Sequence, residues 1–128
     1  MTIIPGKIGK IKQNIIELLE LSISFDTPIF IGESNIKHMV NKHPYDFQKY
    51  SQHIEIILDS PDYVGINPKD CSIEYVKEFQ IDNEFVKVAV RISTSGKYFV
   101  RSLYILNNNR VKNFIAKGTL KPLTKTDT

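Results

Sequence analysis

The stretch F-V-K-V-A-V-R-I-S-T-S-G-K-Y-F-V-R-S-L-Y-I-L, from Phe85 to Leu106, determines the fold that we expect for this chain. Val86, Val88 and Val90 alternate with polar or small residues, a period of two that is typical of a strand with one face against a core. The segment T-S-G interrupts this pattern, and a second β-rich run follows it. The sequence therefore predicts an antiparallel hairpin.

The register of this hairpin depends on its turn. A three-residue loop, with Gly96 in the left-handed conformation, would pair Ser93 with Lys97 and, counted back along both strands, Ala89 with Arg101. A two-residue loop would instead turn Arg101 to the core face, where its guanidinium would be buried without a partner. We therefore prefer the three-residue loop. The polar side chains that it puts on the outward face are those of Arg91, Ser93, Lys97 and Arg101.

Apolar residues at helical spacing dominate the part of the chain before the hairpin. They predict one helix over residues 11–21 and another from about residue 35 to 42, with Ser34 as its N-cap. A third helix is expected to start at Pro44 and to end at the segment D-S-P-D, because proline is accepted at the first position of a helix but disfavours the helical conformation in the residue before it. His43 should therefore sit at a corner between two helices.

The remaining predicted elements are short. Pro28–Gly32 should form an edge strand, Tyr63–Cys71 a loop, and residues 72–80 the first strand of a meander that continues into the hairpin. A last helix is expected from Asn108 to a glycine stop at Gly118. This order predicts an α+β fold, with N-terminal helices packed on one face of an antiparallel sheet of about four strands and the other face open.

Length and composition indicate an ordinary globular protein. The 128 residues, 41% hydrophobic and 24% charged, favour one domain over residues 1–120 with a polar tail over residues 121–128. No run reaches the roughly 20 apolar residues of a membrane span, and the start of the chain lacks the apolar run of a signal peptide. With a lone Cys71, to which we assign no chemistry, these features predict a cytoplasmic protein without a membrane partner.

The net charge of +3 is unevenly distributed along the chain. Residues 1–84 carry eight Lys or Arg and thirteen Asp or Glu, a net −5, whereas residues 85–128 carry nine Lys or Arg and one Asp, a net +8. Clustered cations favour a site for a polyanion such as nucleic acid. A solvated basic face explains the same charges equally well.

The stretch K-H-M-V-N-K-H-P, residues 37–44, contains two of the three histidines. Histidines and arginines can cleave RNA without a metal: one imidazole takes the proton of a ribose 2′-hydroxyl, a second group protonates the departing 5′-oxygen, and cations stabilise the phosphorus centre. His38 and His43 would lie about 140° apart on one continuous helix. Since Pro44 ends that helix, His43 can leave it in a new direction, and we favour His43 over His38 as the acid–base residue.

Other interpretations of these residues remain open. The spacing of the two histidines does not match the H-E-x-x-H motif, so no zinc or other metal site is expected. His53 is interpreted as surface filler, and Arg91 and Arg101 could simply form salt bridges with acidic residues of the N-terminal half.

Four separate blocks carry a resemblance to a known family. They are H-M-V-N-K-H-P-Y-D-F-Q-K-Y, S-P-D-Y-V-G-I-N-P-K-D, S-I-E-Y-V-K and V-K-V-A-V-R-I-S-T-S-G-K-Y-F-V-R-S-L-Y. In this order they resemble the phage-associated branch of the barnase, EndoU, colicin and RelE superfamily of ribonucleases, from about residue 28 to 118.

The resemblance implies a cofactor-free, metal-independent endoribonuclease of phage or toxin type that leaves 2′,3′-cyclic phosphate and 5′-hydroxyl ends. It implies an RNA site on the exposed sheet face, with RNA as partner (tRNA being one candidate) and a cognate antitoxin or immunity protein as a further partner. The residues that match catalytic positions are His43, His38 and Arg91. Those that match substrate-binding positions are Ser93, Lys97, Arg101 and Tyr104.

Two alternatives to an enzyme are kept. The first is a non-catalytic module that binds RNA or protein through a basic sheet face. The second is a structural phage component whose basic face docks another protein.

Overall fold

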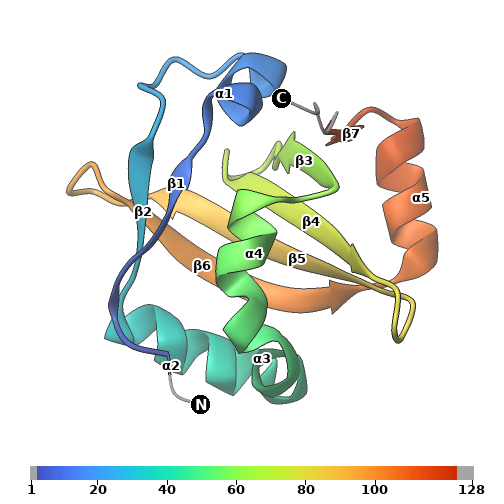
Figure 1. Ribbon diagram of the computed structural model, residues 1–128, viewed down its shortest axis with the longest axis horizontal. Coiled ribbons are helices and arrows are strands. Elements are labelled where there is room, and N and C mark those ends of the chain that lie inside the picture. Colours follow the sequence, from blue (N-terminus) through green and yellow to red (C-terminus); the bar gives the residue numbers. More distant parts are fainter. Residues whose placement is uncertain (1–2, 124–128) are drawn as a thin grey trace.

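The computed structural model describes residues 3–123 and contains one seven-stranded mixed sheet with helices inserted between its strands (Figure 1). The spatial order of the strands is β1-β2-β6-β5-β4-β3-β7, in which β2 and β6 run parallel and all other neighbours run antiparallel. In chain order the elements are β1 (Gly6–Ile11), α1 (Gln13–Leu19), β2 (Thr27–Ile31), α2 (Glu33–Lys42), α3 (Pro44–Tyr50), the 3₁₀ turn η1 (Ser51–His53), α4 (Ile54–Asp59), β3 (Tyr63–Ile66), β4 (Ile73–Phe79), β5 (Glu84–Ile92), β6 (Tyr98–Leu106), α5 (Asn108–Ala116) and β7 (Leu120–Pro122).

The predicted meander is confirmed as β4, β5 and β6. Its turn has the expected three-residue form, since the backbone N of Ser93 donates to the carbonyl oxygen of Lys97 at 2.7 Å. Gly96 has a φ of +86°, a conformation that L side chains rarely adopt and that glycine adopts without steric cost. The choice of a three-residue loop over a two-residue loop was therefore correct.

The pairing expected further along the hairpin was wrong. Ala89 lies opposite Ser102 and not opposite Arg101, because the register shifts between Ala89 and Val90. Val90 pairs with Val100, so Arg101 is the extra residue of a β-bulge in β6. Nothing in the local sequence requires a bulge at this point.

The expected sheet of about four strands was too small, and the helices are interleaved with the strands rather than grouped at the N-terminus. Residues 6–11, 63–66 and 120–122 form strands that were not predicted. The Pro28–Gly32 segment is a strand, but it lies inside the sheet between β1 and β6. Lys121 and Pro122, assigned to the polar tail, belong to β7, and the rest of that tail from residue 124 lies outside the described residues.

The helix bounds and caps predicted from the sequence were only partly correct. Gly32, and not Ser34, is the N-cap of α2. The backbone N of Gly32 donates a hydrogen bond of 2.9 Å to the side-chain oxygen of Asn35. The helix expected from Pro44 to the D-S-P-D segment is divided by η1 into α3 and α4. The final helix is confirmed, with Asn107 accepting hydrogen bonds from two backbone N–H groups of its first turn.

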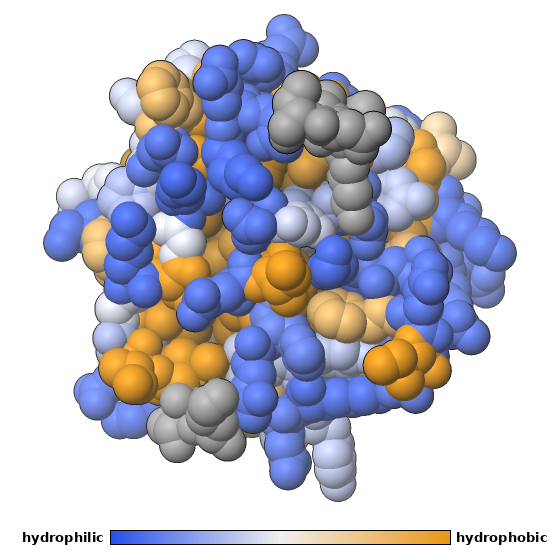
Figure 2. All heavy atoms as spheres, in the orientation of Figure 1, coloured by the Kyte–Doolittle hydropathy of each residue, from blue (hydrophilic) through white to orange (hydrophobic). Residues whose placement is uncertain are grey.

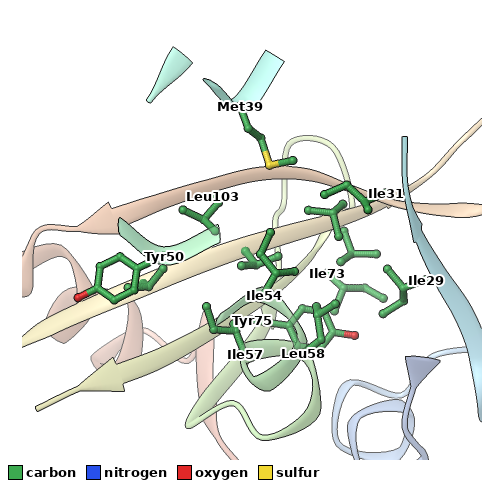
Figure 3. Close-up of a cluster of buried hydrophobic side chains, with 14 of the residues drawn as sticks. Ile29, Ile31, Met39, Tyr50, Ile54, Ile57, Leu58, Ile73, Tyr75 and Leu103 are labelled. Atoms are coloured by element: carbon green, nitrogen blue, oxygen red, sulfur yellow. The ribbon is translucent and has the colours of Figure 1, made fainter. Parts of the chain in front are cut away.

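The main core lies between the sheet and α4, which crosses in front of β4 and β5 (Figure 1). Ile54, Ile57 and Leu58 of α4 belong to this core, and Met39 reaches the same cluster from α2 (Figure 3). All four side chains are at most 1% exposed. On the outer side of α4, hydrophilic side chains dominate and apolar ones form separate groups (Figure 2).

A second, smaller core lies on the opposite face of the sheet. It contains Val76, Leu106 and Leu120 packed against Val111 of α5. The face that was expected to be open is therefore covered by α5 at one end, and the rest of it remains available for a site.

The pairing of β2 with β6 is short and leaves most of that edge of β6 to other elements. β2 is paired with β6 at Tyr98 and Phe99 only, and α2 and α3 also contact β6. The Oδ2 atom of Asp46, in the first turn of α3, accepts a hydrogen bond from the backbone N of Ile105 at 2.9 Å. A side-chain carboxylate thus takes the place of a neighbouring strand and fixes the α2–α3 corner to the sheet.

Candidate functional site

The corner between α2 and α3 has the geometry that the sequence predicts. Helix α2 ends at Lys42, and His43 leaves it with φ −138° and ψ 68° while Pro44 occupies the first position of α3. The ring of His43 stacks on that of Tyr104 in β6, with centroids 4.9 Å apart and planes 25° from parallel. The proline therefore turns this imidazole toward the sheet.

A small pocket lies beside α2 on the outward face of the sheet. Its volume is about 170 Å³, less than the roughly 300–1,000 Å³ of pockets that enclose drug-sized ligands, so it suits a small group such as a phosphate. Its charged and titratable lining residues are His38, Asp70, Arg91 and Arg101, and its small lining residues are Ser72, Ala89 and Ser102.

The β-bulge explains how Arg101 and Ser102 come to line the same pocket. Successive side chains of a regular strand point to opposite faces, so one of the two would normally point at the core. Val100 and Leu103, on either side of this pair, are both fully buried. The bulge inserts one residue between these core positions and so leaves two consecutive side chains on the outward face.

Asp70 is a pocket residue that the sequence did not indicate as functional. Its Oδ1 atom accepts hydrogen bonds from the backbone N of Ser72 at 3.0 Å and from the hydroxyl of Ser72 at 2.7 Å, and its Oδ2 atom lies 3.5 Å from Nη1 of Arg91. These hydrogen bonds, with a smaller contribution from Arg91, hold the pKa of the Asp70 carboxyl below its usual value. Asp70 is thus an ionised partner that orients Arg91, in line with the interpretation that Arg91 forms a salt bridge.

Beneath the His43 stack lies a buried ion pair that was also missed. Nζ of Lys87 is 2.8 Å from Oε2 of Glu74, and the two residues are only 8% and 5% exposed. The same Nζ lies 4.8 Å from the centroid of the Tyr104 ring. Burial alone lowers the pKa of Lys87, but its interactions with Glu74 and Tyr104 outweigh burial and raise it, so Lys87 stays charged below the platform on which His43 stacks.

The alternation of β4 and β5 could have indicated this pair. Glu74 lies opposite Ala89, and Lys87 lies two residues earlier on the same face of β5. A diagonal pair of opposite charges on neighbouring strands is within reach of long side chains. The signal depends on the strand register, which the sequence did not supply for β4.

The structure brings only some of the predicted site residues together. His38, Arg91 and Arg101 share the pocket, and His43 and Tyr104 form the stack. Ser93 and Lys97 belong to neither group. The hydroxyl of Ser93 forms a hydrogen bond with that of Ser95 at 2.7 Å within the hairpin turn.

A larger cavity than this pocket lies elsewhere, between β1 and α4. Its volume is about 860 Å³, and its lining includes His53 but none of the predicted site residues. His53 also contacts the rings of Tyr50 and Phe79 at centroid distances of 6.0 Å and 5.3 Å. Size alone therefore does not identify the site.

A comparison with protein families complements this geometry. The model of the family described as phage-Barnase-EndoU-ColicinE5/D-RelE like nuclease3 matches residues 6–113, most of the chain. The chain belongs to this family. A comparison with curated proteins finds no match, and a comparison with solved structures finds none either.

Membership of this nuclease family applies to the part of the chain that forms the pocket. The matched range includes every residue that lines the pocket and both rings of the His43–Tyr104 stack. The pocket combines two guanidinium groups, an imidazole and two hydroxyls, which can bind a phosphate and move a proton beside it.

Two features are absent from residues 3–123, the part of the chain that the structure describes. No group of three or more His, Cys, Asp and Glu side chains lies close enough to hold a metal ion. Within the same range, no helix has the length and apolar character needed to cross a membrane.

Proposed function

We propose that this nuclease is a metal-independent endoribonuclease that cleaves RNA by attack of the ribose 2′-hydroxyl on the adjacent phosphate. The observation that carries the proposal is the shared pocket of His38, Arg91 and Arg101 in a chain of a nuclease family. The 2′-oxygen forms a bond to phosphorus, the bond from phosphorus to the 5′-oxygen breaks, and the products carry 2′,3′-cyclic phosphate and 5′-hydroxyl ends.

In this mechanism the two arginines bind the scissile phosphate. Guanidinium groups can donate two parallel hydrogen bonds to phosphate oxygens and stabilise the negative charge that grows on them in the transition state. Asp70 holds Arg91 in orientation through its ion pair. The hydroxyls of Ser72 and Ser102 add uncharged donors at the pocket wall.

The two histidines carry the proton transfers. One neutral imidazole accepts the proton of the 2′-hydroxyl, and one imidazolium gives a proton to the departing 5′-oxygen. His38 lines the phosphate pocket itself. His43 is stacked on Tyr104, two residues and about 7 Å along β6 from Ser102 of the pocket. We therefore assign His38 to the phosphate and keep His43 as the second acid–base residue.

The biological setting belongs to the same proposal. We propose RNA as the substrate, with tRNA as one candidate, a toxin-type role in the cytoplasm, and a cognate antitoxin or immunity protein that restrains the enzyme. The family description, which names phage-associated relatives of barnase, colicins and RelE, supports this setting.

The test is incubation of total RNA with the full chain in EDTA. Wild type should generate new 5′-hydroxyl ends, whereas His38→Ala, His43→Ala and Arg91→Ala should each lose most of this activity. The matched control is His53→Ala, which removes a histidine outside the pocket and should cleave like wild type. Intact RNA with folded wild type would overturn the proposal.

One observation favours a second candidate, an RNA-binding module without catalysis. Asp70 already occupies Arg91, and a phosphate would have to share or replace that partner. Such a module would bind RNA in a salt-dependent manner, generate no 5′-hydroxyl ends, and bind equally well after His38→Ala.

A further inference from the structure

Next to the phosphate pocket, a row of three side chains crosses three strands. Phe30 of β2 is paired with Phe99 of β6, and Phe99 is paired with Arg91 of β5. Directly paired residues of neighbouring strands point to the same face of a sheet. The two phenylalanines therefore lie on the same face as the Arg91 guanidinium, in line with it.

This face is the outward one. Phe30 lies between Ile29 and Ile31, which are 0% and 1% exposed and belong to the main core. Because successive side chains alternate, Phe30 points away from that core. Both phenylalanine rings are only partly buried, so part of each remains accessible to a ligand.

The two rings form a tilted pair with a cation beside them. Their centroids are 6.0 Å apart and their planes are 44° from parallel. Nζ of Lys97, an exposed residue immediately before β6, lies 5.3 Å from the centroid of the Phe30 ring. Neither aromatic ring nor Lys97 contributes to the phosphate pocket or to the His43–Tyr104 stack.

Aromatic rings next to positive charge are the usual components of a site for unpaired nucleotides. A base stacks on an aromatic ring irrespective of its identity, and nearby cations bind the backbone phosphates. Two half-exposed phenylalanines without such a ligand would instead be ordinary apolar surface. Their alignment with Arg91 favours the ligand.

We propose that Phe30, Phe99 and Lys97 form a base-stacking subsite adjacent to the phosphate pocket, so that the preferred substrate is single-stranded RNA. This inference rests on the proposed function, since it assumes that Arg91 holds an RNA phosphate. A base paired within a duplex is stacked on its neighbours and hidden from protein rings, whereas an unpaired base can turn out and stack on them. The subsite thus selects loops and single strands over helices.

The test measures binding separately from cleavage. The protein is the full chain carrying His38→Ala, with and without Phe30→Leu or Phe99→Leu, and the matched control is Phe25→Leu at a phenylalanine that is 63% exposed and outside this row. The probes are a labelled single-stranded RNA, the same RNA in a perfect duplex, and a strand of equal length made of abasic nucleotides. Leucine keeps the apolar bulk but removes the flat ring.

The expected result is that each ring substitution weakens binding of the single strand by about 5- to 150-fold, the effect of losing one stacked base. The two ring substitutions should not change binding of the abasic strand or of the duplex. Phe25→Leu should not change binding of any of the three probes. Lys97→Ala should reduce the slope of log affinity against log salt concentration for the single strand, by the amount expected for about one lost phosphate contact.

Three results would overturn the inference. These are unchanged single-strand binding by folded ring variants, an equal loss for all three probes, and equal affinity of the parent protein for the abasic and the base-bearing strand. The comparison of the abasic and base-bearing strands needs no ring variant, so it tests the inference even if a ring substitution prevents folding. Cleavage of RNA with no ring effect would refute the subsite alone, whereas a ring effect with no cleavage would refute the proposed function alone.

Discussion

The Asp46 carboxylate and the backbone N–H of Ile105 form a hydrogen bond of 2.9 Å that joins α3 to the open edge of β6. Asp46 follows Pro44 by two residues, so this bond fixes the corner from which His43 reaches Tyr104. Without it, the backbone of β6 would lose a partner at a partly buried position, and the corner would lose its anchor.

We therefore predict that Asp46→Ala lowers the free energy of unfolding by about 1.5 to 3 kcal/mol, the usual contribution of a hydrogen bond to a charged group. Cleavage should fall as well, because His43 is no longer held over Tyr104. Urea unfolding and RNA cleavage measure the two effects. Asp46→Asn is the matched control, since it keeps an acceptor oxygen and should lose less; an unchanged stability of Asp46→Ala would contradict this account of the corner.

The bulge residue Arg101 should be dispensable for folding but needed for cleavage. We predict that Arg101→Ala reduces the cleavage rate by about 100- to 1,000-fold, the usual effect of removing one donor to a charged transition state. Arg110→Ala is the matched control, because Arg110 is exposed on α5 and lies over the ring of Phe114, outside the pocket. Equal losses in the two variants would point to a general effect of charge rather than to the pocket.

The buried pair of Lys87 and Glu74 gives a prediction with opposite outcomes for single and double variants. Lys87→Met leaves the Glu74 carboxylate buried without its cation and should cost about 3 to 5 kcal/mol of unfolding free energy. Lys87→Met combined with Glu74→Leu removes both charges and should recover most of that loss. Chemical denaturation of wild type, Lys87→Met, Glu74→Leu and the double variant tests the cycle, and a loss in the double variant equal to the sum of the two single losses would contradict it.

Tyr50 predicts how stability depends on pH in alkaline solution. Burial, with the hydrogen bond to Glu84, raises the pKa of Tyr50 from 10.0 to about 12. The folded protein therefore keeps a proton that the unfolded chain has lost, so stability should be fully present below pH 10 and decline as the pH rises toward about 12. The unfolding free energy of Tyr50→Phe, measured by urea unfolding, should decline less steeply than that of wild type across this pH range. Tyr45→Phe, at an 84% exposed position, is the control and should behave like wild type.

The hairpin was predictable because its signals are local. A period of two along β5 and β6 and a glycine in the turn between Ser93 and Lys97 determine both strands and their connection. The corner at His43 was predictable for the same reason, since Pro44 affects the residue beside it.

The missing strands depend on partners that are distant in sequence. The four residues of β3 include Gly65, where an added Cβ would meet the backbone oxygen of Thr119, and glycine is usually a sign of a turn. Its strand conformation comes from pairing with β4 and β7, far away along the chain. Local propensity cannot report such pairings.

In the candidate site too, local sequence predicts the residues but not how they come together. The sequence supplied His38, Arg91 and Arg101, but their convergence depends on the bulge, for which the residues around Arg101 carry no signal. The preference for His43 over His38 came from the helix geometry alone. The pocket adds a reason to assign His38 to the phosphate, and only the histidine variants can decide between the two.

The central claim is attack by the ribose 2′-hydroxyl at the pocket of His38, Arg91 and Arg101. Its most direct test compares a single-stranded RNA with the same strand lacking every 2′-hydroxyl, both incubated with the full chain in EDTA. We predict that the RNA is cut to products with 2′,3′-cyclic phosphate ends and that the 2′-deoxy strand stays intact. Cleavage of the 2′-deoxy strand, or cleavage of RNA that stops when EDTA is present, would contradict the account.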